Sequence, residues 1–391
     1  MGTTEASGTE SRTERADFQA TADPALMEAA DRTADVKLLT YEELYLLWER
    51  QQWQTQELDF SRDREDWNER FSEEERFQRM YGLSSFFIGE QKVAEELGPI
   101  MRAAPTEDQR IFLCTQIADE ARHVRFFERF YREVGVLESG ELSQMLEQTS
   151  EHLNENFGRL FDEMLKQRTD RLSVEPEDTE ALVEAVTIYH MVIEGMLALT
   201  GQHFIMDYNE REGTLPAFVA GFQNVARDEH RHVAFGSVFL REKAREDDRY
   251  KQAIQRTLEQ SLPVADGVLS PPWAPQGDDW ELFGYSLADT RKFAGTCLMR
   301  RLKVIGLQLA GRGRDVVWGG GGGLAFGRWR AFGGSRGGRW GWFFGRRSAF
   351  DRWGRGRRRR SAFDRRSGRG RGDGFATDGD HHRATGRRGA G

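Results

Sequence analysis

The feature that most constrains the fold is a six-residue motif that occurs twice, far apart in the chain. It reads DEARHV at 119–124 and DEHRHV at 228–233. In both copies a Glu precedes a His by three residues, and residues at i and i+3 lie on the same face of a helix. Each copy therefore presents a carboxylate and an imidazole to one point, provided that the segment is helical. The pairs are Glu120 with His123 and Glu229 with His232.

Each motif follows a segment that carries a single Glu within an apolar run. Glu90 ends the run SSFFIGE, and Glu194 lies inside AVTIYHMVIEGMLALTG. A buried carboxylate is costly unless it is paired, protonated or bound to a metal. Two helices that give one Glu each and two that give Glu-x-x-His form the arrangement by which four-helix bundles hold two iron or manganese ions. The repeated order therefore favours a dimetal site over solvated surface pairs.

The predicted ligands combine four carboxylates and two imidazoles, a mixture that suits Fe or Mn better than a closed structural zinc site. They are Glu90, Glu120, His123, Glu194, Glu229 and His232. The other histidines of the body lack this spacing, and we expect them to be surface or structural residues. These are His152, His190, His203 and His230. Ligand type does not separate Mn from Fe.

Apolar residues at i, i+3, i+4 and i+7 predict a mostly helical body from about residue 41 to 310. The four helices that carry the ligands are expected at 71–101, 106–133, 178–202 and 216–244. Ser72 followed by Glu75 fits a capping box at the start of the first. Proline is expected to break helices in LGPI, RAAP, SVEP and SPPWAP. The pattern indicates an all-α fold, a four-helix bundle with additional helices.

The two ends of the chain differ in composition from this body. Residues 1–35 are polar, charged and without period, which predicts a disordered leader. Residues 311–391 contain 24 of the 42 Gly and carry 21 Arg against 6 Asp, with no Lys or Glu. We interpret this tail as disordered. It is either an arm that binds single-stranded nucleic acid or a non-native, possibly frameshifted, extension. The second alternative is favoured by the sharp difference in amino-acid composition between the body and the tail.

The cysteine content and the hydropathy of the chain indicate its cellular location. The chain has two cysteines, Cys114 and Cys297, both in apolar helical patterns, so we expect core thiols, no disulfide framework and a cytoplasmic location. The N-terminal residues lack the apolar region of a signal peptide. We also expect no membrane span, because no uninterrupted apolar run approaches the roughly 18 residues that a span needs.

With these motifs, residues 36–310 resemble the ferritin-like superfamily and, within it, the ribonucleotide reductase small-subunit family. LLWERQQWQTQELDFSRDREDW at 46–67 is similar to the N-terminal segment of that family, and the two DE-x-x-H helices are similar to its metal helices. The resemblance implies a ferritin-like bundle, a homodimer and a dimetal-carboxylate site that reacts with dioxygen.

Two branches of the family fit to different degrees. In the reductase small subunit the first ligand is usually Asp, and a radical Tyr usually lies seven residues after the Glu of the first Glu-x-x-His. This chain has Glu90 and Phe127 at those positions. A phenolic radical at position 127 is therefore excluded, although some small subunits work without that Tyr.

The other branch is the small-subunit-like ligand-binding oxidase. The resemblance to it implies one Mn and one Fe ion, with two Fe as the alternative, and a long-chain fatty-acid-like ligand. It also implies a Val–Tyr ether cross-link between a Val three residues after the first ligand and a Tyr five residues before the third. Val93 and Tyr189 occupy those positions. The implied reaction is a two-electron oxidation of an apolar ligand.

Two further residues bear on the choice. Asp228 matches a family residue that supports a metal-bound His, and we expect it to hydrogen-bond His123. Trp53 resembles the family's radical-transfer Trp, which keeps the reductase alternative with its large-subunit partner open. No Tyr follows Tyr285, however, and that alternative needs one in its C-terminal tail. Iron storage and RNA binding through the tail are the remaining alternatives.

Overall fold

The computed structural model describes residues 38–137, 140–275, 280–308 and 330–331. The chain divides into two compact units, Met1–Gly333 and Gly334–Gly391, and all described residues belong to the first. The predicted leader 1–35 lies outside the described residues, as does the predicted tail 311–391 except for 330–331.

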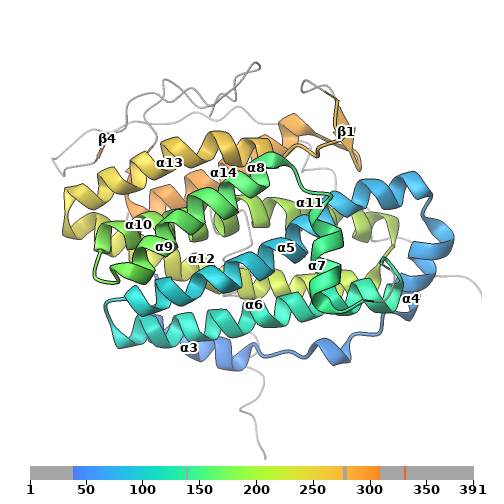
Figure 1. The fold of residues 1–391 in the computed structure, drawn as a ribbon, viewed down its shortest axis with the longest axis horizontal. Helices are drawn as coiled ribbons and strands as arrows, with labels where there is room; N and C mark the ends of the chain where they lie inside the picture. The colour runs from blue at the N-terminus through green and yellow to red at the C-terminus, as the bar shows by residue number, and fades with distance from the viewer. Residues whose placement is uncertain (1–37, 138–139, 276–279, 309–329, 332–391) are drawn as a thin grey trace, which may run out of the picture. The chain divides into compact units, whose positions relative to one another are not determined.

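The described part of the chain is almost entirely helical, as predicted (Figure 1). Its helices before the first long loop are α3 (Tyr41–Arg50), η1 (Thr55–Glu57), α4 (Ser61–Glu65), η2 (Asp66–Arg70), α5 (Glu73–Ala103) and α6 (Glu107–Val134). Those that follow are α7 (Leu142–Ser150), α8 (Glu155–Gly158), η3 (Arg159–Leu165), α9 (Lys166–Val174), α10 (Thr179–Val186), η4 (Thr187–Ala198), α11 (Leu199–Glu212), α12 (Pro216–Glu246), α13 (Asp248–Val268) and α14 (Leu287–Ile305).

Strands within the described residues are limited to two short antiparallel pairs. β1 (Glu281–Leu282) pairs with β2 (Tyr285–Ser286), so that Glu281 faces Ser286. β3 (Leu307–Gln308) pairs with β4 (Arg330–Ala331). The all-α prediction is therefore confirmed.

The four expected ligand-bearing helices form close to the predicted limits. α5 and α6 lie side by side (Figure 1), and α12 packs against η4. The capping box at the start of α5 is present: the Ser72 hydroxyl accepts from the Glu75 amide, and the Glu75 carboxylate accepts from the Ser72 amide. Thr106 and Gln109 cap α6 in the same way. These caps satisfy backbone donors that the first turn of a helix leaves free.

One of the four helix breaks predicted at proline is absent from the structure. α5 continues through Pro99 to Ala103. The ring removes one backbone hydrogen bond, but Leu97 and Ile100 on either side are fully buried and hold the turn in the helix. The breaks expected at the other three proline sites are present, because α5, α9 and α13 end before them.

The third ligand-bearing helix differs most from its prediction. It runs without interruption from Thr179 to Glu212, and its centre, Thr187–Ala198, is a π-helix. A π-helix bonds i to i+5 and occurs frequently at functional sites. Tyr189 and Glu194, five residues apart, therefore belong to one hydrogen-bonded turn.

This long helix also changes the expectation about membrane spans. Thr179–Glu212 contains an 18-residue window with a mean hydropathy of 1.5, so it is long and apolar enough to cross a membrane by length and composition. The search for an uninterrupted apolar run did not single out this segment, because the window is defined by its mean hydropathy. However, 83% of the window is buried inside the protein. The apolar sequence is that of a helix surrounded by other helices.

The core divides into two clusters of buried side chains. One surrounds η4, α9, α10 and α13 and is largely aliphatic. The other lies between α5, α6 and α12 and is rich in phenylalanine, with Phe127 fully buried against Phe86, Phe218 and Phe222. The prediction of two core thiols is half right, because Cys297 is buried and Cys114 is exposed.

Candidate metal centre

The structure brings all six predicted ligand side chains to one place inside the bundle. They form two groups, each with ligand atoms within 4.8 Å of one another. The first group is Glu90, Glu120, His123 and Glu229, and the second is Glu120, Glu194, Glu229 and His232. Every member is buried. Residues from four helices thus converge without any contribution from a loop.

Glu120 and Glu229 belong to both groups and can bridge two ions. His123 Nδ1 lies 3.3 Å from Glu120 Oε2 and 3.6 Å from Glu229 Oε1. His232 Nδ1 lies 3.3 Å from Glu120 Oε1 and 3.5 Å from Glu229 Oε2. Each carboxylate therefore turns one oxygen toward each histidine. Glu90 and Glu194 complete the groups as terminal carboxylates, 3.1 Å from His123 Nδ1 and 3.4 Å from His232 Nδ1.

The far nitrogen of each histidine faces an aspartate. His123 Nε2 lies 3.2 Å from Asp228 Oδ2, so the expected hydrogen bond is present. His232 Nε2 lies at the same distance from Asp119 Oδ2. A carboxylate in this position accepts the Nε2 hydrogen and leaves the Nδ1 lone pair free for a metal. Asp119 is a residue whose role sequence reasoning missed, although it precedes its Glu just as Asp228 does.

The two aspartates are themselves held by two arginines and two tryptophans. The Arg231 guanidinium donates to Asp119 Oδ2 at 2.8 Å and to Asp228 Oδ1 at 2.7 Å. Arg122 also donates to both aspartates. Trp53 Nε1 donates to Asp228 at 2.7 Å, and Trp48 Nε1 donates to Asp119 at 2.9 Å. Two Trp–Asp–His chains thus lead outward from the centre.

The protonation of the cluster reflects crowded negative charge. Burial raises the pKa values of the Glu90 and Glu194 carboxyls well above the usual range of a glutamate. Burial alone would lower the pKa of His123, but the Glu90 carboxylate and the bond to Asp228 raise it well above the usual value. The pKa of His232 rises for the same reason, through Glu120 and Asp119. The carboxylates therefore attract positive charge strongly.

The residues present fit a pair of metal ions. Within the carboxylate–histidine cluster, four buried ligand atoms lack a hydrogen-bond partner: Glu120 Oε2, Glu194 Oε2, Glu229 Oε2 and His232 Nδ1. Such orphaned atoms are rare in proteins and need a cause. Two cations would satisfy them and compensate the buried carboxylates.

Val93 and Tyr189 are buried near this cluster on two different helices, α5 and η4. The Tyr189 hydroxyl is fully buried and donates to Glu120 Oε1 at 3.0 Å. Burial and the neighbouring glutamates raise the pKa of Tyr189 well above its usual value, so the phenol keeps its proton. Val93 is buried one turn beyond Glu90 on α5 and, with Glu90, lines a cavity.

Gln116 and His190 are neighbours of the cluster that sequence reasoning did not connect with it. Gln116 Nε2 donates to Glu194 Oε1 at 2.9 Å, and Gln116 Oε1 lies 3.2 Å from His190 Nε2. Burial lowers the pKa of His190 to about 3, so its ring is neutral. Gly236 lets α12 approach this ring, since a Cβ there would lie 2.2 Å from His190 Cβ. The spacing of these residues in the sequence gives no sign of these contacts, which only the folded structure shows.

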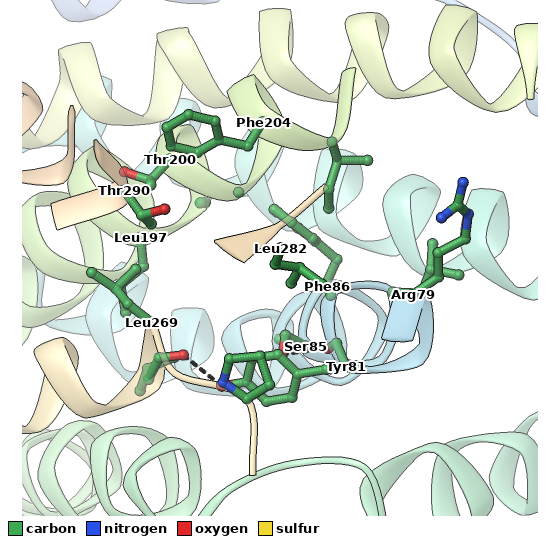
Figure 2. Close-up of a pocket in the computed structure, with 18 of the residues that line it drawn as sticks. Arg79, Tyr81, Ser85, Phe86, Leu197, Thr200, Phe204, Leu269, Leu282 and Thr290 are labelled. Atoms are coloured by element: carbon green, nitrogen blue, oxygen red, sulfur yellow. Dashed lines mark hydrogen bonds between the residues drawn. The ribbon is translucent and has the colours of Figure 1, made fainter. Parts of the chain in front are cut away.

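A cavity of about 220 Å³ opens beside the cluster. Its lining includes Glu90, Glu194 and Glu229, and most of the remaining side chains are apolar or aromatic. A single water needs roughly 10–15 Å³ of such space, so the cavity accommodates an extended organic molecule. Figure 2 shows Phe86, Leu197, Leu269 and Leu282 around it.

Comparisons with known proteins agree with this geometry. An R2-like ligand-binding oxidase, a valine-to-leucine variant with an anaerobically reconstituted Mn/Fe cofactor, matches with a TM-score of 0.59 and 26% identity over 68% of this chain and 93% of that chain. A tyrosine-to-phenylalanine variant of such an oxidase, aerobically reconstituted with Mn/Fe, matches with a TM-score of 0.55 and 25% identity over 68% and 91%. A glycine-to-leucine variant with a non-activated Mn/Mn cofactor gives 0.55 and 25% over 68% and 90%.

A family model extends the comparison from structure to sequence. The model for the small chain of ribonucleotide reductase matches residues 35–269, which include all six residues of the carboxylate–histidine cluster. This match spans more than half of the chain, and the structural matches above have the same ferritin-like fold. The chain therefore belongs to the ribonucleotide reductase small-chain family, whose members are oxidoreductases.

Proposed function

We propose that this protein is a dioxygen-activating Mn/Fe oxidase that performs a two-electron oxidation of an apolar, fatty-acid-like ligand. One observation supports this above the others: three of the cluster's glutamates line an apolar cavity that also reaches Val93. A reductase small subunit stores an oxidising equivalent for a partner and needs no organic ligand beside its metals. A cavity at the ligands fits an oxidase that acts on a bound molecule.

The residues of the chain have distinct roles in this proposal. Glu90, Glu120 and His123 would hold one ion, and Glu194, Glu229 and His232 the other, with Glu120 and Glu229 bridging. Bound ions would supply the activation of dioxygen and the oxidising power. The apolar lining excludes water from the reacting end of the ligand. Asp228 and Asp119 keep the histidine rings oriented through Nε2.

We also propose that Val93 and Tyr189 become joined by an ether bond. A C–H bond of Val93 and the O–H bond of Tyr189 would break, and one C–O bond would form. The two electrons and two protons would pass to dioxygen, which is the oxidant. Support comes from the burial of both residues beside the cluster and from the hydrogen bond that directs the Tyr189 hydroxyl to Glu120.

The test is mass spectrometry of protein reconstituted anaerobically with Mn and Fe, before and after exposure to air. We expect the intact protein to lose two hydrogen atoms and a linked peptide pair containing Val93 and Tyr189 to appear. Tyr189→Phe is the matched control, since it keeps the ring and the metal ligands and lacks the reacting oxygen. Protein that binds and oxidises both metals without forming the link would contradict the cross-link and favour the reductase alternative.

That alternative, a small subunit that lacks the usual Tyr radical, is supported by the chain from Trp53 through Asp228 to His123. Its own test is ribonucleotide reduction after mixing with a reductase large subunit. The buried Phe127 offers no phenol for the usual radical. Activity in that mixture, abolished by Trp53→Phe, would replace the oxidase proposal.

The assembly, compartment and tail complete the proposal. A homodimer follows from the family, and a cytoplasmic location agrees with the two free cysteines. We propose a single oxidase domain at 36–310 with a separate Arg/Gly-rich tail. Iron storage would require a multi-subunit shell filled with iron, which sedimentation would reveal. RNA binding that is lost when 311–391 is deleted would give the tail a function of its own.

A further inference from the structure

Gln116 is a fully buried amide beside one of the two terminal carboxylates. It lies on α6, about one turn before Glu120. Its Nε2 donates to Glu194 Oε1 at 2.9 Å, and its Oε1 lies 3.2 Å from His190 Nε2. A carboxylate that binds a metal is ionised and only accepts hydrogen bonds. The amide must therefore turn its NH₂ group to Glu194 and its carbonyl to His190, so that His190 Nε2 is the donor in the second contact.

The His190 ring is held in place by its neighbours. Its centre lies 4.5 Å from that of the Tyr189 ring and 5.4 Å from that of Phe235. The backbone of α12 approaches at Gly236, where a Cβ would lie 2.7 Å from His190 Cγ. Such close packing on several sides leaves the ring little room to turn. The hydrogen bond from His190 therefore keeps the Gln116 amide in one orientation.

The hydrogen bond from Gln116 acts on the oxygen of Glu194 that faces the metal site. Glu194 Oε1 is also the atom that lies 3.4 Å from His232 Nδ1. If the carboxylate rotated, Oε1 would leave Gln116 and lose a hydrogen bond to a charged group, which is stronger than one between neutral groups. His190 and Glu194 both project from η4 toward the same amide. One residue of α6 thus restrains the Glu194 carboxylate.

Glu90, the terminal carboxylate of the other position, has different surroundings. Its Oε2 lies 3.1 Å from Nδ1 of His123, which is itself a ligand. Within the part of the chain that the structure describes, no side chain from outside the cluster donates a hydrogen bond to Glu90. The two positions therefore share their donor types but differ in the freedom of one donor. Geometry, and not affinity alone, selects between similar divalent metals, so this difference bears on which ion is bound.

We propose that Gln116, oriented by His190, is a positioning residue that fixes the Glu194 carboxylate and thereby sets the preference of the metal position beside His232 between Mn(II) and Fe(II). This inference rests on the two-metal centre of the proposed function and is independent of its organic ligand and its cross-link. Gln116 does not bind an ion itself. Its effect is confined to the position of which Glu194 is the terminal ligand.

The experiment isolates each position by removing the terminal carboxylate of the other. Glu90→Ala leaves the position beside His232, and Glu194→Ala leaves the position beside His123. Full-length protein is titrated anaerobically with Mn(II) and, separately, with Fe(II), in competition with a chelator. In the Glu90→Ala background, Gln116→Met keeps an unbranched side chain and removes the donor. It should weaken binding roughly 10- to 100-fold, the effect of a hydrogen bond to a charged group, and change the ratio of the two affinities.

The Glu194→Ala background is the matched control. There Gln116→Met should change neither affinity, because the carboxylate that Gln116 holds is absent. A general loosening of the bundle would instead weaken binding in both backgrounds. His190→Phe is the second variant, since it keeps an aromatic ring and the Gln116 donor. In the Glu90→Ala background it should weaken binding about 3- to 10-fold, the effect of a neutral hydrogen bond.

Two results would overturn the proposal. One is an equal loss of affinity in both backgrounds, and the other is an unchanged ratio of Mn(II) to Fe(II) affinity in both Gln116→Met and His190→Phe. If the two positions bind only as a unit, the Mn:Fe ratio of protein loaded from an equimolar mixture takes the place of the single affinities. Gln116→Met should change that ratio, and an unchanged ratio again overturns the proposal.

Wild-type protein distinguishes a failure here from a failure of the proposed function. If wild type binds neither metal, the metal centre itself is refuted, and the role of Gln116 with it. If wild type binds both metals and the variants match it, only the role of Gln116 is refuted. A selectivity that depends on Gln116, found in a protein that never forms the Val93–Tyr189 link, would leave the positioning role standing without the cross-link.

Discussion

The metal position beside His123 and the position beside His232 are built from equivalent side chains in different surroundings. Each combines one terminal Glu, two shared Glu and one His whose Nε2 faces an Asp. The donor atoms of the two positions are therefore the same. Any preference for Mn at one position and Fe at the other must come from what lies around the ligands.

Those surroundings differ in three ways. Glu90 lies on an uninterrupted α-helix, whereas Glu194 lies in a π-helix and accepts a hydrogen bond from Gln116. The Tyr189 hydroxyl meets Glu120 Oε1, the oxygen that faces His232. Trp53 behind the His123 position is 9% exposed, whereas Trp48 behind the His232 position is only half-buried. The duplicated motif thus accounts for the ligands, and single residues account for the asymmetry.

Loss of a shared carboxylate should have the largest effect, because it affects both positions. Glu120→Ala is expected to weaken binding at both by on the order of 100-fold or more, beyond the cost of losing an outer partner. Metal content after dialysis, measured by elemental mass spectrometry, checks this. Full Mn and Fe occupancy in the variant would refute the assignment of Glu120 as a bridging ligand.

Loss of a terminal carboxylate should affect one position and thereby distinguish them. Glu90→Ala and Glu194→Ala are a matched pair, and each should leave about one ion per chain because the other donor set stays complete. The identity of the remaining ion, measured in the same way, shows which position prefers Mn. Identical losses of both metals from both variants would mean that the two positions bind only as a unit.

Changing the aspartates behind the histidines should have a smaller effect of the same kind. Asp228→Asn should weaken binding at the His123 position, and Asp119→Asn at the His232 position, each by roughly 10- to 100-fold. The Asn side chain has the same size as Asp but lacks its negative charge. It therefore no longer holds the histidine in the tautomer that carries its hydrogen on Nε2. Competition titration with a chelator measures both affinities, and unchanged affinity in Asp119→Asn would show that the two halves are not equivalent.

The tryptophans should give the smallest and most unequal pair of effects. Trp53→Phe removes a buried hydrogen bond to Asp228 and should lower the free energy of unfolding by about 1–3 kcal/mol. Trp48→Phe should cost less than about 1 kcal/mol, because water can reach Asp119 from its half-buried side. Chemical denaturation of the metal-free proteins measures both. Equal losses would contradict the difference in burial on which this prediction rests.

Much of the fold was predictable because its determinants are local. Caps at Ser72 and Thr106 and apolar periodicity defined the helices to within a few residues, with the third ending later than expected. Pro99 was misread because packing of its neighbours outweighed one lost hydrogen bond. The prediction for Cys114 was wrong because apolar neighbours in the sequence do not show which face of the helix is exposed to solvent.

The sequence by itself determined which residues could share a metal, because the i, i+3 spacing of Glu and His is a property of any helix. Only the tertiary structure decided that Glu120 and Glu229 turn one oxygen to each histidine. It also placed Gln116 beside Glu194 and Asp119 behind His232. These contacts join positions far apart in the chain, and their geometry depends on how helices pack, which no local spacing encodes.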